Sequence, residues 1–140
     1  MEVPLKPMGK EDIRKLESAL LIMSLFDAET LENIKNPENR LTWLDSLYIA
    51  AAAIARDKAG IPITQIAEEL GITEMTLRKH IKGETKAGQL VLKEYDKLSK
   101  EGFKIELPKE LSEEYNKEIE ELKNKLELVK NTLKDLLNKL

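Results

Sequence analysis

The sequence predicts an all-α protein, in which a bundle of five to six helices is followed by a separate C-terminal helix. Apolar residues recur at helical spacing through most of the 140 residues, and glycine and proline are sparse. A chain of this length suits one domain with a core plus an appendage. We expect a flexible arm at 1–10, a helical domain at 11–102, a linker at 103–108 and a coiled-coil helix at 109–140.

Composition excludes several kinds of chemistry. The chain has no cysteine and a single histidine, His80, so it offers neither disulfides nor a His-rich or thiolate metal site. We expect His80 to be partly exposed in the last turn of a helix, where a protonated imidazole is favourable. No uncharged run approaches the roughly 20 apolar residues of a membrane span. We therefore predict a cytoplasmic protein that is not an enzyme and needs no metal or cofactor.

The first half of the chain predicts three helices before a sharp stop. Two prolines without periodicity mark the arm, and helices are expected at 11–26 and 27–34. The stretch 36–39 contains Pro37 between two asparagines, which predicts a break. Thr42 and Asp45 have the spacing of a capping box that starts the third helix. Its segment 47–55, LYIAAAAIA, is apolar on every side, which predicts a central buried helix.

Residues 64–82 have the spacing of a helix-turn-helix. Thr64 is the expected cap of a first helix, and Gly71 ends that helix because glycine adopts the left-handed conformation easily. Thr73 is the expected cap of a second helix, with Leu77 on its buried face. The residues left pointing outward are Glu74, Met75, Arg78, Lys79 and Lys82. Such an outward set is what a recognition helix presents to DNA.

Charge is distributed unevenly along the chain. The formal net charge is −3, which argues mildly against a nucleic-acid binder. However, residues 78–100 contain seven basic and three acidic residues, whereas the segments on either side are net acidic. The one net-positive block therefore begins inside the proposed recognition helix, where contacts to phosphates are needed.

The last part of the chain predicts two further helices. Residues 86–100 have helical spacing, and Phe103, Ile105 and Leu107 then alternate with charges as in a short strand. From Tyr115 a heptad pattern begins that is typical of a coiled coil. Its core positions are Tyr115, Ile119, Leu122, Leu126, Val129, Leu133, Leu136 and Leu140. We expect a two-chain coiled coil; the alternative is packing against the 86–100 helix of the same chain.

Residues 48–82 resemble the last three helices of a cyclin-type repeat in transcription factor B, the archaeal and eukaryotic initiation factor. The likeness lies in YIAAAAIA, ITQIAEELGI and TEMTLRKHIK. It implies a cyclin-like bundle, with Met75 in the place of a small apolar base contact and Arg78 in that of an arginine reaching a base edge. The chain has no zinc ribbon or second repeat, unlike a general initiation factor. It is also similar to a small archaeal group of regulators found next to KaiC-like ATPases.

We therefore predict a sequence-specific regulator of transcription that binds double-stranded DNA as a coiled-coil homodimer. The expected DNA contacts are Thr73, Glu74, Met75, Arg78, Lys79, Lys82 and Lys86. The alternative is an adaptor, for example of an ATPase, in which the bundle and the coiled coil dock a protein partner. Glu74 on the supposed DNA face and the negative net charge favour the alternative.

Overall fold

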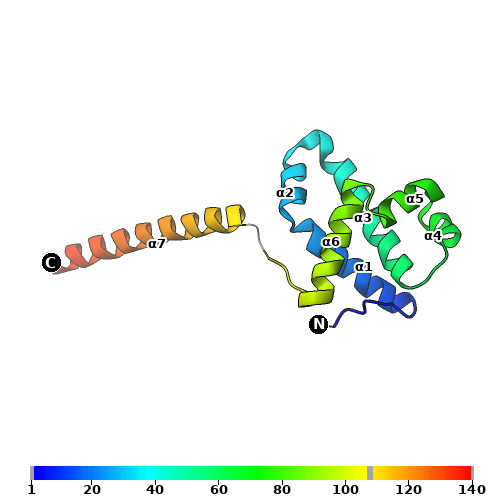
Figure 1. Ribbon diagram of the computed structural model, residues 1–140. Coiled ribbons are helices and arrows are strands. Elements are labelled where there is room, and N and C mark those ends of the chain that lie inside the picture. The colour runs from blue at the N-terminus through cyan, green and yellow to red at the C-terminus, as the bar shows by residue number, and fades with distance from the viewer. Residues whose placement is uncertain (1, 107–108, 140) are drawn as a thin grey trace. The chain divides into compact units, whose positions relative to one another are not determined.

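An alanine-rich helix, α3 (Pro37–Lys58), lies at the centre of the bundle in the computed structural model, which describes residues 2–106 and 109–139 (Figure 1). It packs against every other helix of the bundle, namely α1 (Lys10–Leu25), α2 (Ala28–Lys35), α4 (Ile63–Leu70), α5 (Glu74–Ile81) and α6 (Lys86–Glu101). Residues 50–55 are at most 1% exposed, because alanine side chains let neighbouring helices approach closely. The buried centre is therefore confirmed, although Tyr48 is 53% exposed.

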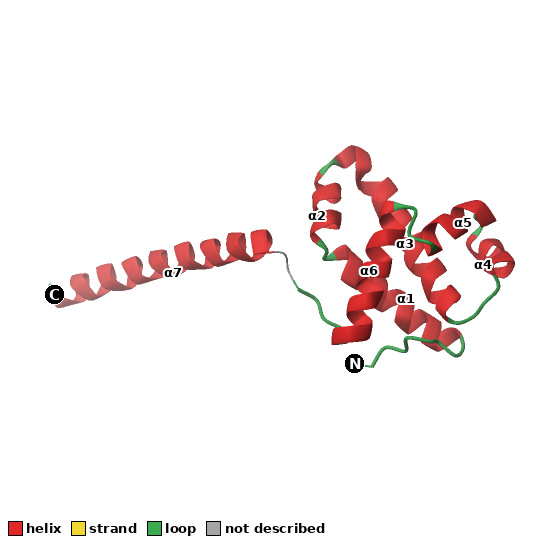
Figure 2. Cartoon of the chain, in the orientation of Figure 1, coloured by secondary structure: helices red, strands yellow, loops and turns green. Residues whose placement is uncertain are grey.

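The described residues form helices and loops and no strand (Figure 2), which confirms the all-α fold class. Residues up to Glu106 form one unit, and α7 (Lys109–Asn138) belongs to a second. The strand considered after Gly102 is wrong for residues 103–106, which are irregular and have no neighbouring strand to pair with. Leu107 and Leu140, which we placed in that strand and in the heptad, lie outside the described residues. None of the described helices could cross a membrane.

Helix α3 begins earlier than its sequence signals indicated. The first helical residue is Pro37, and the side chain of Asn36 caps it by accepting from the backbone N–H of Glu38 at 3.0 Å. The predicted capping box of Thr42 and Asp45 is therefore wrong, since both residues lie inside the helix and are exposed. Proline favours the first helical position, because the N–H that it lacks would have no partner there.

The main core is formed by α1, α3 and α6. Its buried residues include Leu16, Leu20, Met23, Trp43, Leu47, Ile54, Leu90, Val91 and Leu98. The N-terminal arm covers part of this core, which corrects the expectation of flexibility for residues 2–9. Val3 and Leu5 pack against the core, Pro7 is buried, and the Tyr95 hydroxyl donates to the Leu5 carbonyl at 2.7 Å. Met1 lies outside the described residues.

A buried carboxyl pair connects the start of α2 with α6. Asp27 caps α2 and accepts from Lys93 Nζ at 2.9 Å and from the Glu29 N–H at 2.9 Å. Glu94 is only 4% exposed and shares a hydrogen bond with Asp27. Burial, together with that hydrogen bond, raises the pKa of Glu94 to about 7. Burial would also raise the pKa of Asp27, but its hydrogen bonds bring that pKa below the ordinary value.

A second, smaller core holds α4 and α5 against α3. It consists of Ala53 from α3, Ile66 and Ala67 from α4, and Leu77 from α5. Isoleucine and leucine side chains around it are partly buried, and they belong to the ends of the two short helices and the loops beside them. This cluster determines where the exposed face of α5 lies.

Candidate nucleic-acid interface

The turn between α4 and α5 has the conformation that the sequence predicts. Gly71 ends α4 with φ 67° and ψ 34°, and the N–H of Ile72 donates to the Ala67 carbonyl at 3.1 Å. This is the left-handed stop for which glycine has no Cβ penalty. Thr73 caps α5, since its hydroxyl oxygen accepts from the Thr76 N–H at 3.1 Å. Both predictions are confirmed.

The predicted cap at the other end of α4 is wrong. The helix begins at Ile63, after Pro62, and no side chain caps it. Thr64 is already inside the first turn and is exposed. Proline adopts an extended ψ here with a φ near −59°, which lets the next residue begin the helix directly.

One face of α5 is buried and the opposite face is exposed. Leu77 is 0% exposed and belongs to the second core, as predicted. Six of the seven predicted DNA contacts lie on α5 or at its caps, and Lys86 opens α6. Of this set Glu74 is half-buried; the exposed members are Thr73, Met75, Arg78, Lys79, Lys82 and Lys86. The helix therefore presents several cations and one large apolar side chain to solvent.

An ion pair joins two members of this exposed face. Glu74 Oε2 lies 3.6 Å from Arg78 Nη2, and both side chains remain about half exposed. The residues are four apart on one helix, a spacing at which opposite charges attract only weakly in water. The Arg78 guanidinium is therefore oriented by Glu74 yet remains available to another acceptor.

His80 differs from its expected state. It is 6% exposed, and burial lowers its pKa below the ordinary value. Its Nδ1 lies 2.8 Å from the Thr85 hydroxyl. The oxygen of this hydroxyl accepts from the Gly88 N–H at 2.9 Å and so caps α6. His80 therefore lies in the last turn of α5, as expected, but it is buried rather than partly exposed. Spacing could have shown this, because residue 80 is three positions after buried Leu77.

The backbone of α6 approaches the end of α5 closely at Gly88. A Cβ atom on Gly88 would lie 2.4 Å from the His80 carbonyl oxygen, closer than real contacts allow. Only glycine permits this approach of the two helices. His80, Thr85 and Gly88 therefore position the C-terminal end of α5, and sequence reasoning assigned none of them this role.

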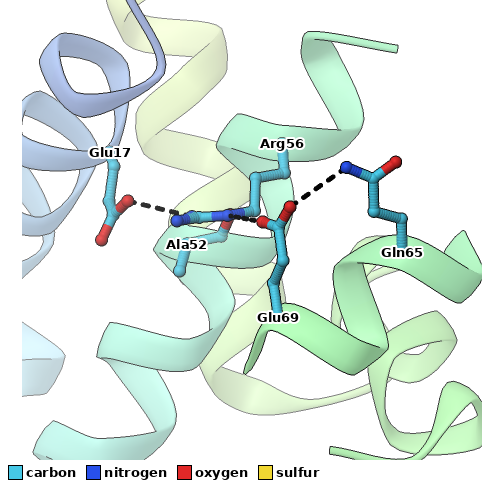
Figure 3. Close-up of polar contacts among 5 residues, drawn as sticks. All are labelled: Glu17, Ala52, Arg56, Gln65 and Glu69. Atoms are coloured by element: carbon cyan, nitrogen blue, oxygen red, sulfur yellow. Dashed lines mark hydrogen bonds and ion pairs between the residues drawn. The ribbon is translucent and has the colours of Figure 1, made fainter. Parts of the chain in front are cut away.

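Arg56 of α3 joins that helix to α1 and α4 through its side-chain hydrogen bonds (Figure 3). Its Nη1 donates to Glu17 Oε2 of α1 at 3.0 Å and to the Ala52 carbonyl at 2.9 Å. Its Nε donates to Glu69 Oε2 of α4 at 3.1 Å, while Gln65 donates to the other oxygen of Glu69 at 3.2 Å. Hydrogen bonds from Gln65 and then Arg56 lower the pKa of Glu69. This network contributes to the placement of α4, and helical periodicity alone did not indicate it.

The described residues 2–106 and 109–139 contain no group of three or more histidine, aspartate or glutamate side chains arranged to hold a metal ion. The exposed cations of α5 and its flanks are Arg78, Lys79, Lys82 and Lys86. Their chemistry suits the recognition of negatively charged or hydrogen-bonding groups.

The chain is 53% identical over 104 residues to the uncharacterized protein MJ1053 of Methanocaldococcus jannaschii. The matched region is 74% of this chain and 64% of that protein, so the chain spans less than two thirds of the relative's length. No family model and no solved structure matches the chain.

Proposed function

We propose that the chain is a sequence-specific DNA-binding regulator of transcription. The observation that carries this proposal is the two-sided character of α5. Leu77 and His80 anchor the helix, while Met75, Arg78, Lys79 and Lys82 are exposed on it. A short helix with one face packed against the core and cationic side chains on the opposite, exposed face has the form of a recognition helix in the major groove.

Each exposed side chain has a chemical role in this proposal. Arg78 donates to a base edge, most simply to the O6 and N7 of guanine. Met75, which is 68% exposed, contacts a thymine methyl group, and Glu74 tunes base choice by holding or releasing Arg78. The remaining contacts, Thr73, Lys79, Lys82 and Lys86, bind phosphates and orient the helix.

The cyclin-like architecture is part of the same proposal. A central α3 surrounded by the other bundle helices, and followed directly by α4 and α5, suits the resemblance to transcription factor B. The similarity to an archaeal protein suits an archaeal regulator of cytoplasmic DNA. Since Met75 is larger than the residue usual in that family, we expect a different base preference.

Helix α7 supports a dimer. Its heptad positions are exposed, with Ile119 at 48%, Leu126 at 70% and Leu133 at 56%. A helix of 30 residues that leaves such a stripe in water gains stability by pairing with a second copy. In a two-fold dimer, the two α5 helices would lie about 34 Å apart, or a multiple of that, to enter successive major grooves.

A protein-interaction adaptor is the second candidate. The Glu74–Arg78 ion pair partly neutralises the proposed DNA face, and the chain has a net charge of −3. In that case the bundle and α7 would dock a protein such as an ATPase, and α4 and α5 would serve as scaffold.

Selection from a randomised duplex pool, followed by affinity measurements, tests the proposal. We expect Arg78→Ala to lose about 1–3 kcal/mol of binding free energy and to relax preference at one base pair. Lys82→Ala should weaken binding to all sequences alike and reduce the salt dependence. Arg40→Ala is the matched control, since Arg40 lies about 20 Å along α3 from Ala53, where α5 packs.

Two results would replace the regulator with the adaptor. The first is equal affinity of wild type and Arg78→Ala for every duplex in the selected pool. The second is no retention of DNA at low salt, together with a stoichiometric complex between the purified chain and a protein partner.

A further inference from the structure

A charged groove lies between α1, the C-terminal end of α3 and α4. Its volume is about 510 Å³. Its charged lining consists of Lys10 and Arg14 from α1, Arg56 from α3 and Glu69 from α4, so three cations face one carboxylate. The amide of Gln65 adds a neutral hydrogen-bonding group. The charged lining of the groove is therefore net positive, although the chain as a whole has a formal net charge of −3.

The three cations differ in how they are paired. Lys10 and Arg14 are four residues apart on α1 and therefore share a face of that helix. Over residues 2–106 and 109–139, neither has a carboxylate oxygen within 4.0 Å. Arg56, by contrast, is fixed from behind by Glu17 and by the Ala52 carbonyl. Two exposed cations are thus left in the groove beside a preorganised guanidinium.

We propose that this groove binds a phosphate group. Guanidinium groups match phosphate oxygens with paired hydrogen bonds, and a lysine adds a mobile charge. In this proposal the phosphate takes the place of the Glu69 carboxylate beside Arg56. The Glu69 side chain is 42% exposed and free to move into solvent, whereas the Glu17 side chain is 14% exposed and stays paired with Arg56. Glu69 therefore marks the position at which an incoming anion meets Arg56.

The phosphate has two chemical sources. One is a small phosphorylated molecule or inorganic phosphate, for which a groove of about 510 Å³ has room. The other is the backbone of a bound duplex, and that source rests on the proposed DNA-binding function. The variants below distinguish the two, because only the second source requires DNA.

The first experiment is an NMR titration of the full chain with inorganic phosphate, against sodium chloride at equal ionic strength. We expect saturable shifts of the Gly9, Ile61 and Gln65 amides with phosphate alone. Arg14→Gln should weaken phosphate binding about tenfold, since it removes a charge-assisted hydrogen bond. Glu69→Gln should strengthen it several-fold, because the competing carboxylate is gone.

Lys15→Gln is the matched control. Lys15 is the neighbour of Arg14 on α1 but pairs with Glu11 at 3.9 Å and does not line the groove. Lys15→Gln removes one positive charge, as Arg14→Gln does, so a general effect of net charge would appear in both variants. We expect Lys15→Gln to bind phosphate as the wild type does.

The second experiment compares the same variants for duplex affinity in chloride buffer. If free phosphate does not saturate but Arg14→Gln binds DNA about tenfold more weakly than Lys15→Gln, the backbone of the duplex is the source. If phosphate saturates while DNA affinities are equal, the ligand is a small phosphate, whether or not the chain binds DNA. The proposal is overturned if phosphate and chloride give the same shifts and the two variants bind DNA equally.

Discussion

The bundle of residues 2–106 and helix α7 use the same apolar residues with opposite results. In the bundle Leu16, Leu20 and Leu47 are 0% exposed, whereas on α7 Leu126 and Leu133 are more than half exposed. Both regions have apolar side chains at helical spacing, so periodicity alone does not distinguish them. The difference is that the bundle helices pack around a shared central helix, α3, whereas α7 is a single helix. A repeated apolar stripe therefore predicts a helix, but its partner must be established separately.

The same substitution, leucine to alanine, is expected to have very different effects in the two regions. Leu47→Ala should lower the free energy of unfolding by about 2–5 kcal/mol, because it leaves a cavity in the main core. Leu126→Ala should change the stability of the bundle by less than about 0.5 kcal/mol. Urea denaturation followed by the fluorescence of Trp43 measures this, since the chain has one tryptophan and it lies in the bundle core.

The same pair of variants also tests the alternative arrangement of α7. If Leu126→Ala lowers the mass of the particle in sedimentation while the Trp43 transition is unchanged, α7 pairs between chains. Equal losses of bundle stability in the two variants would instead mean that α7 folds back on the bundle, and the proposed dimer would be wrong.

A smaller effect is expected where the two short helices join the bundle. Gly88→Ala places a Cβ against the His80 carbonyl, so α5 and α6 must separate. We expect a loss of about 1–3 kcal/mol, although alanine is the better helix former. Thermal unfolding measures the loss, and DNA affinity should fall with it because α5 is displaced.

Gln89→Ala is the control for that substitution, since Gln89 is the exposed neighbour of Gly88 on the same helix. It should leave stability within about 0.5 kcal/mol of the wild type. A Gly88→Ala protein that is more stable than wild type would show that the contact between α5 and α6 is not tight.

Sequence reasoning succeeded where one residue determines the local backbone. Gly71 and Thr73 were predicted because a left-handed stop and a side-chain cap each depend on a single residue type. It failed where the sequence offers two possible starts for the same helix. Asn36 caps α3 well before the box at Thr42, with Pro37 as the first helical residue, and α4 begins directly after Pro62 rather than at Thr64.

Contacts between distant residues could not be predicted from periodicity. Arg56 meets Glu17 across 39 positions, and Tyr95 meets Leu5 across 90. Such pairs depend on how the helices pack, and a single sequence does not reveal that packing. The groove behind α4 and the docking of the N-terminal arm were therefore found only in the structure.

The stability of the bundle should also depend weakly on pH, through Glu94 and His80. Glu94 has a folded pKa of about 7, above its ordinary 4.5, so the native state holds its proton more tightly than the unfolded state does. Its contribution is fully present below pH 4.5 and is lost as pH rises through 7. His80 acts oppositely, because its lowered pKa makes the fold more stable as pH rises through about 6.5.

Glu94→Gln separates these two opposing contributions. The amide keeps the size of the side chain and can still donate to Asp27, but it does not titrate. Relative to wild type, the variant should therefore gain about 1–2 kcal/mol of stability between pH 5 and pH 7. Asp27, Lys93 and Lys97 face the same position; the pKa of Asp27 is lowered and that of Lys93 raised, so the charges of these two groups do not change in this range. Trp43 fluorescence in urea measures the unfolding of the bundle alone. If the free energy of unfolding varied with pH in the same way for wild type and variant, Glu94 would be excluded as the titrating group.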